Sequence, residues 1–200
     1  MHAASLRLFL IRHGESEWSL SVQHTGHTDI ALTAHDEELA RALGPSLWAV
    51  RFDHVLTSPT HRAQRTCALA GLGGAAEMEP DLAEWDYGEY EGQTSADIRQ
   101  KRPGWNVFRD GCPGGETVEE VALRADRLIT RLATLSGNMA LFSNGQFGCS
   151  LAARWIGTAV IEGQHLMLGT GSIGVLGYNP AYPELRAIAH WNFSPNSPLG

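Results

Sequence analysis

Short apolar segments alternate with longer segments of helical periodicity, and this alternation is the feature that most constrains the fold. Apolar runs occupy residues 6–11, 53–57 and 138–143. Such runs predict buried strands, because strands covered on both faces carry continuous apolar residues. Strands that alternate with helices are typical of an α/β fold. We therefore expect a three-layer sandwich with a mostly parallel sheet covered by helices on both faces.

The intervening segments carry helix signals. Thr33 is a plausible N-cap for the first predicted helix, and Ser58 followed by Pro59 predicts the start of the second. Gly137 would end the third. The predicted helices are residues 31–50, 58–71, 116–137 and 145–157, and later strands are predicted at 171–179 and 184–192.

The chain has 200 residues, which is about one domain. No internal repeat, low-complexity tract or shift in composition indicates a linker. We therefore predict one domain over residues 1–200. The loop-rich segment at about 81–115 would be an insertion that contributes to the site.

Composition narrows the class of partner and the compartment. The net charge of −7 argues against nucleic acid or an anionic membrane as partner, but a few local arginines could still bind a small anion. The chain contains three cysteines and no CxxC pair, which favours a reducing compartment over a disulfide framework. No segment has the roughly 20 apolar residues of a membrane span. We expect a cytoplasmic protein.

Arg12, His13 and Gly14 follow the first predicted strand directly. Ligands of open α/β sheets bind beyond the carboxyl ends of the strands, and glycine permits a tight turn and close approach of a ligand. A histidine among cations at this position can attack phosphorus and carry a phosphoryl group. The alternative is a histidine that caps a helix or fills a gap.

Two further segments add charged groups. Arg62 lies one turn into the helix predicted after the second strand, where it could either bind an anion or remain solvated. The glycine-rich loop at 81–92 contains several carboxylates, any one of which could act as a general acid or be a surface charge. These carboxylates are Glu84, Asp86, Glu89 and Glu91.

The order of these motifs resembles the histidine phosphatase superfamily, the phosphoglycerate-mutase-like group. The segments that carry the resemblance are LIRHGESEW, QHTGHTDIALT, TSPTHRAQRT and LAEWDYGEYEG. Two others, GWNVFRDGCPGGET at 104–117 and LMLGTGSIGVLGY at 166–178, look most like the sedoheptulose-1,7-bisphosphatase branch.

The resemblance implies catalytic roles. His13 would be the nucleophile that becomes phosphohistidine, and Arg12 and Arg62 would bind the phosphoryl group. Glu84 would be the general acid and then the general base. No cofactor or metal is required, because the arginines would neutralise the charge of the phosphoryl group.

The resemblance also implies substrate contacts. Thr25 and Gly26 would add hydroxyl and amide donors near the phosphate, with assistance from Ser19, and Tyr87 would line the substrate side. The partner would be a small-molecule phosphate ester. A homodimer is possible, with the apolar stretch 171–178 at its edge.

Asn144 departs from the family pattern, because it occupies the place of a second histidine and is followed by Gly145 and Gln146. Its amide could still donate to a phosphoryl oxygen, but it carries no charge. Three explanations remain open. The enzyme is active with a neutral donor, the protein binds phosphate esters without turnover, or the residue was substituted to trap a complex.

Two more features bear on ligands. Arg109 belongs to a basic cluster in the 81–115 segment and is our candidate for binding a second phosphate of a sugar bisphosphate, the alternative being a solvated helix face. His24 and His27, with Asp29 nearby, have a spacing that can ligate zinc, but no third ligand motif accompanies them.

The sequence thus predicts a cofactor-independent phosphatase that acts on a phosphomonoester of a sugar or small metabolite. Two alternatives remain: a phosphoglycerate mutase, which would pass the phosphoryl group to a second substrate, and a catalytically impaired phosphoester-binding protein.

Overall fold

A six-stranded sheet forms the centre of the computed structural model, which describes residues 6–14 and 17–194. The strand order is β3-β2-β4-β1-β5-β6. β1 to β4 are mutually parallel, β5 is antiparallel to β1, and β6 is antiparallel to β5, so only β5 runs against the others. The strands are β1 (Arg7–Arg12), β2 (His54–Thr57), β3 (Ala76–Met78), β4 (Asn138–Ser143), β5 (Ile173–Tyr178) and β6 (Arg186–Phe193).

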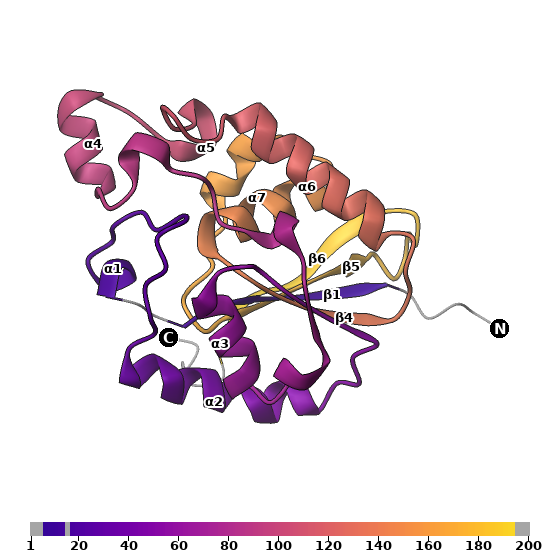
Figure 1. The fold of residues 1–200 in the computed structure, drawn as a ribbon. Helices are drawn as coiled ribbons and strands as arrows, with labels where there is room; N and C mark the ends of the chain where they lie inside the picture. Colours follow the sequence, from indigo (N-terminus) through magenta and orange to yellow (C-terminus); the bar gives the residue numbers. More distant parts are fainter. Residues whose placement is uncertain (1–5, 15–16, 195–200) are drawn as a thin grey trace.

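Helices cover both faces of the sheet, which confirms the predicted α/β sandwich (Figure 1). One face carries α2 (Ala34–Trp48) and α3 (His61–Leu69), and the other carries α6 (Val118–Leu132) and α7 (Gly145–Trp155). Three short helices lie elsewhere, namely α1 (Glu17–Leu20), α4 (Ser95–Lys101) and α5 (Val107–Asp110). No helix in the described part of the chain is long and apolar enough to cross a membrane.

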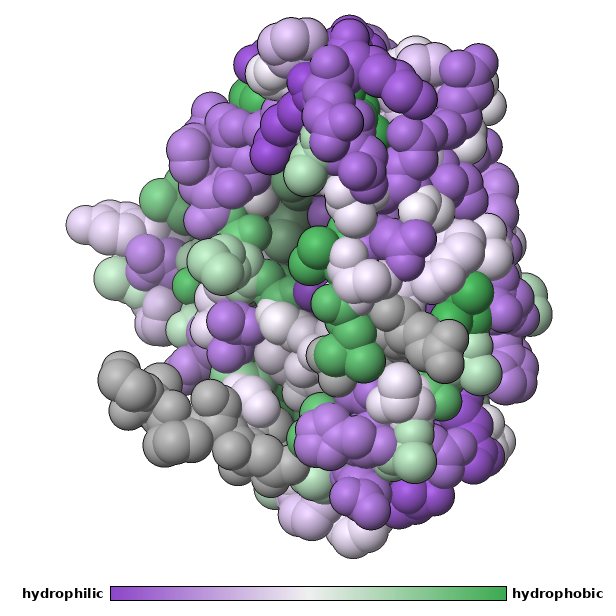
Figure 2. All heavy atoms as spheres, turned by 90° about the vertical axis from the view of Figure 1, so that its left-hand side faces the viewer, coloured by the Kyte–Doolittle hydropathy of each residue, from purple (hydrophilic) through white to green (hydrophobic). Residues whose placement is uncertain are grey.

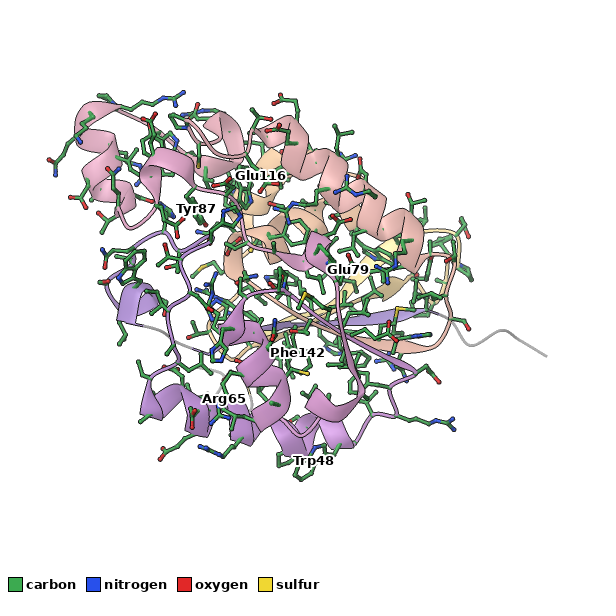
Figure 3. All side chains as sticks on the ribbon, in the orientation of Figure 1. Trp48, Arg65, Glu79, Tyr87, Glu116 and Phe142 are labelled. Atoms are coloured by element: carbon green, nitrogen blue, oxygen red, sulfur yellow. The ribbon has the colours of Figure 1, made fainter. Side chains whose placement is uncertain are left out.

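The strand β1 explains why the first apolar run is continuous. Leu8 and Leu10 pack among residues of α6 and α7, whereas Phe9 and Ile11 pack among residues of α2 and α3. Successive side chains point to opposite faces, and each face meets a layer of helices. Phe142 of β4, labelled in Figure 3, belongs to the same core as Phe9 and Ile11.

All four predicted helices are shorter in the structure, and two of the boundaries have a clear physical reason. α3 begins at His61 with Thr60 as its N-cap, instead of Ser58. Ser58 instead extends the pairing of β2 with β4, because its amide donates to the carbonyl of Phe142 at 2.8 Å. α6 ends at Leu132, and the chain then turns through Gly137, whose positive φ of 87° no longer fits a helix.

The segment at 81–115 contains more structure than a loop. Two 3₁₀ turns, Pro80–Leu82 and Gly88–Tyr90, precede α4 and α5. Figure 1 shows α4 and α5 near the end of the molecule at which β1 finishes. Gln23 pairs with Thr94 in an isolated β-bridge, so this segment contacts the loop that follows α1. The strand β3 was not predicted, because its three residues are partly or fully exposed and form no apolar run.

Candidate active site

The parallel pairing of β1 with β4 places His13 at a junction of strand ends. Arg12, the last residue of β1, is in register with Ser143, the last residue of β4. The amide of His13 then donates to the carbonyl of Ser143 at 3.1 Å. The predicted gathering of charged residues at the carboxyl ends of parallel strands is therefore found here.

Two contacts fix the tautomer of His13. Its Nδ1 lies 2.5 Å from the carbonyl oxygen of Gly14, and a carbonyl only accepts, so Nδ1 carries the proton. The Nε of Arg62 donates to Nε2 of His13 at 3.3 Å, so Nε2 presents a lone pair. Burial, with the positive charges of Arg62 and Arg12, holds the pKa of His13 well below its usual 6.5. The imidazole is therefore neutral at physiological pH.

Arg62 is fully buried and binds the loop that precedes α2. Besides His13, its guanidinium donates to the carbonyls of Thr25, Gly26 and Thr28 at 2.9, 3.1 and 3.1 Å. The arginine thus holds this loop next to the histidine ring while leaving its charge beside Nε2.

The side chain of Arg12, the last residue of β1, lies against the start of α7. Its Nη1 donates to the carbonyl of Leu168 at 2.6 Å, and its Nε is buried without a hydrogen-bond partner among the described residues. A Cβ on Gly145 would lie 3.0 Å from Cζ of Arg12, so glycine leaves room for the guanidinium at this helix start. A buried donor without a partner is uncommon and is consistent with an anion-binding role.

Glu84 is held by the first turn of α7. Its carboxylate accepts from the amides of Gln146 and Phe147 at 3.1 and 2.7 Å and from its neighbour Trp85 at 3.0 Å. Such amides and the helix dipole stabilise a negative charge. Burial nevertheless outweighs them and raises the pKa of Glu84 above its usual 4.5. A carboxyl with a raised pKa can be protonated under mildly acidic conditions and can donate that proton.

Arg124 of α6 fixes the segment that carries Glu84. Its Nη1 donates to the carbonyls of Asp81 and Ala83 at 3.0 and 2.8 Å. Its guanidinium also forms two hydrogen bonds with Glu116, at 2.8 and 2.7 Å, and lies 4.1 Å from the centre of the Phe147 ring. Figure 3 labels Glu116 above the sheet, near α5.

A cavity of about 340 Å³ opens beside these groups, and we call it the main cavity because His13 and Glu84 line it. Figure 2 faces this end of the molecule and shows a hollow there, with hydrophilic residues above it. Seven predicted site residues line the cavity: Arg12, His13, Ser19, Thr25, Glu84, Tyr87 and Gln146. Gly145 lines a neighbouring cavity of about 290 Å³, which also contacts Arg12 and Gln146.

Asn144 is fully buried at the N-cap of α7. Its Nδ2 donates to Oγ of Ser58 and to the carbonyl of Leu82, both at 3.2 Å. Its Oδ1 has no hydrogen-bond partner in the described part of the chain. The amide nitrogen expected to face a phosphoryl oxygen is thus engaged by protein acceptors.

Two predicted substrate contacts need correction. The amide of Gly26 donates to the carboxylate of Glu91 at 2.9 and 3.0 Å, so it is not free to bind phosphate. Arg109 is exposed, pairs with Asp110 at 2.8 Å and is not among the described residues that line either cavity. The adjacent carboxylate already neutralises the arginine that was expected to bind a second phosphate.

Sequence reasoning missed four residues that line the main cavity, namely Val22, Gln23, His24 and Ser95. His24 was considered only as a zinc ligand with His27. The structure buries His24, whereas the His27 side chain is 70% exposed and lies 3.9 Å from Asp86. No group of three or more metal-ligating side chains occurs within residues 6–14 and 17–194. A cue was present in the sequence, since His24 lies within the same QHTG segment as Thr25.

Comparison with known proteins identifies the family. The model of the histidine phosphatase superfamily, branch 1, matches residues 8–190. The chain belongs to this superfamily. It is 39% identical over 186 residues to an acid phosphatase of Mycobacterium tuberculosis, with 91% of each chain covered. It is 31% identical over 192 residues to sedoheptulose 1,7-bisphosphatase of Saccharomyces cerevisiae, covering 80% of this chain and 71% of that one.

Solved structures of this superfamily have the same fold. The structure of an open reading frame product of M. tuberculosis superposes with a TM-score of 0.89 at 36% identity, over 94% of this chain and 98% of that chain. A putative alpha-ribazole-5'-P phosphatase of Escherichia coli gives a TM-score of 0.82 at 28% identity, over 95% and 97%. The relatives include a sedoheptulose 1,7-bisphosphatase, which supports the resemblance to that branch. The acid phosphatase of M. tuberculosis has a higher sequence identity to this chain than that bisphosphatase has.

The replacement Arg124→Met should lower the free energy of unfolding by about 3 kcal/mol, because it leaves Glu116 without its partner and releases the carbonyls of residues 81 and 83. Arg127→Met is the matched control on the same helix. Arg127 also pairs with an acid, Asp81, but its side chain is 61% exposed, so the loss should stay below about 1 kcal/mol. Urea unfolding of both variants measures the difference. Equal losses would contradict a special role for Arg124.

Proposed function

We propose that this histidine phosphatase is a cofactor-independent phosphatase that hydrolyses a phosphomonoester of a sugar or small metabolite through a phosphohistidine on His13. The observation that carries the proposal is the neutral His13 imidazole, whose Nε2 lone pair lies beside the buried charge of Arg62. A neutral nitrogen with a fixed lone pair is a competent nucleophile toward phosphorus.

In the first step, the hydrogen bond from Nε of Arg62 releases Nε2, the freed lone pair attacks the phosphorus atom, and the bond between phosphorus and the leaving oxygen breaks. The electron pair of that bond stays on the leaving oxygen, which takes a proton from the carboxyl group of Glu84. Arg12, whose Nε has no partner among the described residues, and Arg62 compensate the charge of the transferring group. The products are phosphohistidine and a neutral alcohol.

In the second step, a water molecule enters the position that the alcohol has left. The carboxylate of Glu84 takes a proton from this water as its oxygen attacks phosphorus. The bond between Nε2 and phosphorus breaks, and its electron pair returns to the imidazole. Inorganic phosphate, neutral His13 and protonated Glu84 result, so the cycle closes without a metal or cofactor.

The relatives support phosphatase chemistry, since those at 39% and 31% identity are named as phosphatases. A phosphoester-binding protein without turnover is the alternative that one observation favours, because Asn144 places a neutral, internally bonded amide at the end of β4. A phosphoglycerate mutase differs in the acceptor of the second step, which would be a phosphoglycerate instead of water.

Phosphohistidine should be trapped on His13 and on no other residue. Rapid quenching of the protein with a phosphate ester, followed by mass spectrometry under alkaline conditions, should locate one added phosphoryl group there. His13→Ala should show none. Phosphate found on another side chain would contradict the mechanism, and transfer of the group to 3-phosphoglycerate in place of water would identify a mutase.

Hydrolysis of an alkyl phosphate should be fastest at acidic pH. The reaction needs neutral His13, whose pKa lies well below 6.5, and protonated Glu84, whose pKa lies above 4.5. Activity should therefore fall as the pH rises through the pKa of Glu84, and at lower pH as His13 gains a proton. Profiles of kcat/KM against pH measure both limbs.

Glu84→Gln is the control for this assignment. It should reduce kcat/KM, which reports the first step, by about 10² or more for an alkyl phosphate, and much less for 4-nitrophenyl phosphate, whose leaving group needs no proton. Equal losses on the two esters would contradict the role of Glu84 as general acid.

Asn144→His should raise kcat by up to about 10², the scale of one charged donor in a preorganised anion site. Asn144→Ala, which adds no donor, should give no increase. Steady-state rates on one phosphate ester, with circular dichroism to establish folding, measure both variants. A folded Asn144→His protein with unchanged kcat would show that a cation at this position contributes nothing.

A further inference from the structure

Five neutral polar residues line the main cavity, and we call them the neutral end: Ser19, Gln23, His24, Thr25 and Ser95. Arg12, His13 and Glu84 line the same cavity. A phosphoryl group beside these three residues would leave the alcohol part of an ester to contact the neutral ones.

Backbone contacts fix His24 in the neutral end. Its amide donates to the carbonyl of Gln93 at 2.9 Å, and its carbonyl accepts from the amide of Gly92 at 2.8 Å. The side chain of Gln23 donates to the carbonyl of Gly92 at 2.6 Å. The loop before α2 is therefore attached to the segment before α4 on both sides of this histidine.

Packing fixes the imidazole as well. Its centre lies 4.6 Å from that of the Tyr87 ring, with 31° between the planes, and 5.3 Å from that of Trp105. Its Nε2 lies 3.1 Å from Oγ of Ser95, and only 7% of the residue is exposed. Tyr87 and Trp105 are themselves buried, so the ring has little freedom to turn.

The second ring nitrogen, Nδ1, has no hydrogen-bond partner in residues 6–14 and 17–194, although His24 lines the cavity. Nδ1 is not among the buried atoms that lack a partner, so it is accessible from the cavity. Burial also lowers the pKa of His24 to about 4, an effect that Glu91 opposes and Arg99 reinforces. The group that faces the cavity is therefore an uncharged donor or acceptor.

The cations near the neutral end do not form a second anion site. Arg12 is the only arginine or lysine among the described residues that line the main cavity. Arg99 lies on α4, one turn beyond Ser95, and its Nε donates to the carbonyl of Trp105 at 2.9 Å. Hydroxyl groups, and not a second phosphate, match the donors and acceptors found here.

We propose that His24 is a specificity-determining residue that hydrogen-bonds a hydroxyl group of the leaving alcohol, so that the preferred substrate is the monophosphate of an uncharged polyol and not a bisphosphate. This inference rests on the proposed function for the orientation of the ester. Ser95, Tyr87 and Trp105 act through His24 by positioning its ring.

Binding to the full-length His13→Ala protein, which cannot form phosphohistidine, tests the proposal independently of turnover. The ligands are ribitol 5-phosphate, pentyl phosphate and ribitol 1,5-bisphosphate, measured by isothermal titration calorimetry. The first two share five carbons and one phosphate but differ in hydroxyl groups. Ribitol 5-phosphate should bind about tenfold more tightly than pentyl phosphate, the scale of one good hydrogen bond.

The same measurements on His13→Ala/His24→Phe show whether His24 causes the preference for ribitol 5-phosphate over pentyl phosphate. Phenylalanine keeps an aromatic ring against Tyr87 and Trp105 but lacks both nitrogens, so the tenfold preference should fall to about twofold. If the double variant fails to fold, Ser95→Ala in the His13→Ala background takes its place, and freeing Nε2 should reduce the preference about threefold.

Three results would overturn the proposal. They are equal binding of ribitol 5-phosphate and pentyl phosphate, tighter binding of the bisphosphate by tenfold or more, and an unchanged preference in a folded His24→Phe protein. The second result would make Arg99 the candidate for a second phosphate. Failure of the proposed function would appear separately, as no phosphate release from any of these esters by the protein with His13 intact.

Discussion

The contact between the Glu84 carboxylate and the first amides of α7 is the interaction on which the site depends. It joins the 81–92 segment to the helix that follows β4. Arg124 holds the segment that carries Glu84 in place by donating to the carbonyls of residues 81 and 83. A helix N-terminus in this position could bind a free anion. Here it instead stabilises the carboxylate that we propose as the acid and base, so the phosphoryl group must depend on the arginines.

Arg62 and Arg12 each have a structural and an electrostatic role. Arg62 holds the loop at 25–28 and donates to His13 with the same guanidinium, which ties the geometry of the loop to the protonation state of the nucleophile. Arg12 keeps a buried Nε without a partner among the described residues. In the proposed function, the cost of burying Arg62 and the Nε of Arg12 is offset when the phosphoryl group binds beside them.

Particular elements show how far the sequence could lead. The strand at 138–143 was predicted with its observed bounds, and Thr33 caps α2 as its position indicated. Ser58 was wrongly assigned to a helix start, because its pairing with Phe142 depends on a neighbouring strand. The pairing of Arg109 with Asp110, its neighbour in the sequence, depends on side-chain conformations in α5 that the sequence pattern does not specify. Local signals predicted elements well, whereas the partners of charged side chains required the fold.

The sequence by itself determined the α/β class and the position of His13 after a buried strand, because these follow from local patterns of apolar residues and glycine. It also carried the family resemblance that selected Glu84 among four carboxylates. Only the tertiary structure decided the tautomer of His13, the engagement of Asn144 with Ser58 and the place of His24 in the cavity. Each of these depends on groups separated along the chain, or on the conformation of a turn, and no local pattern specifies such contacts.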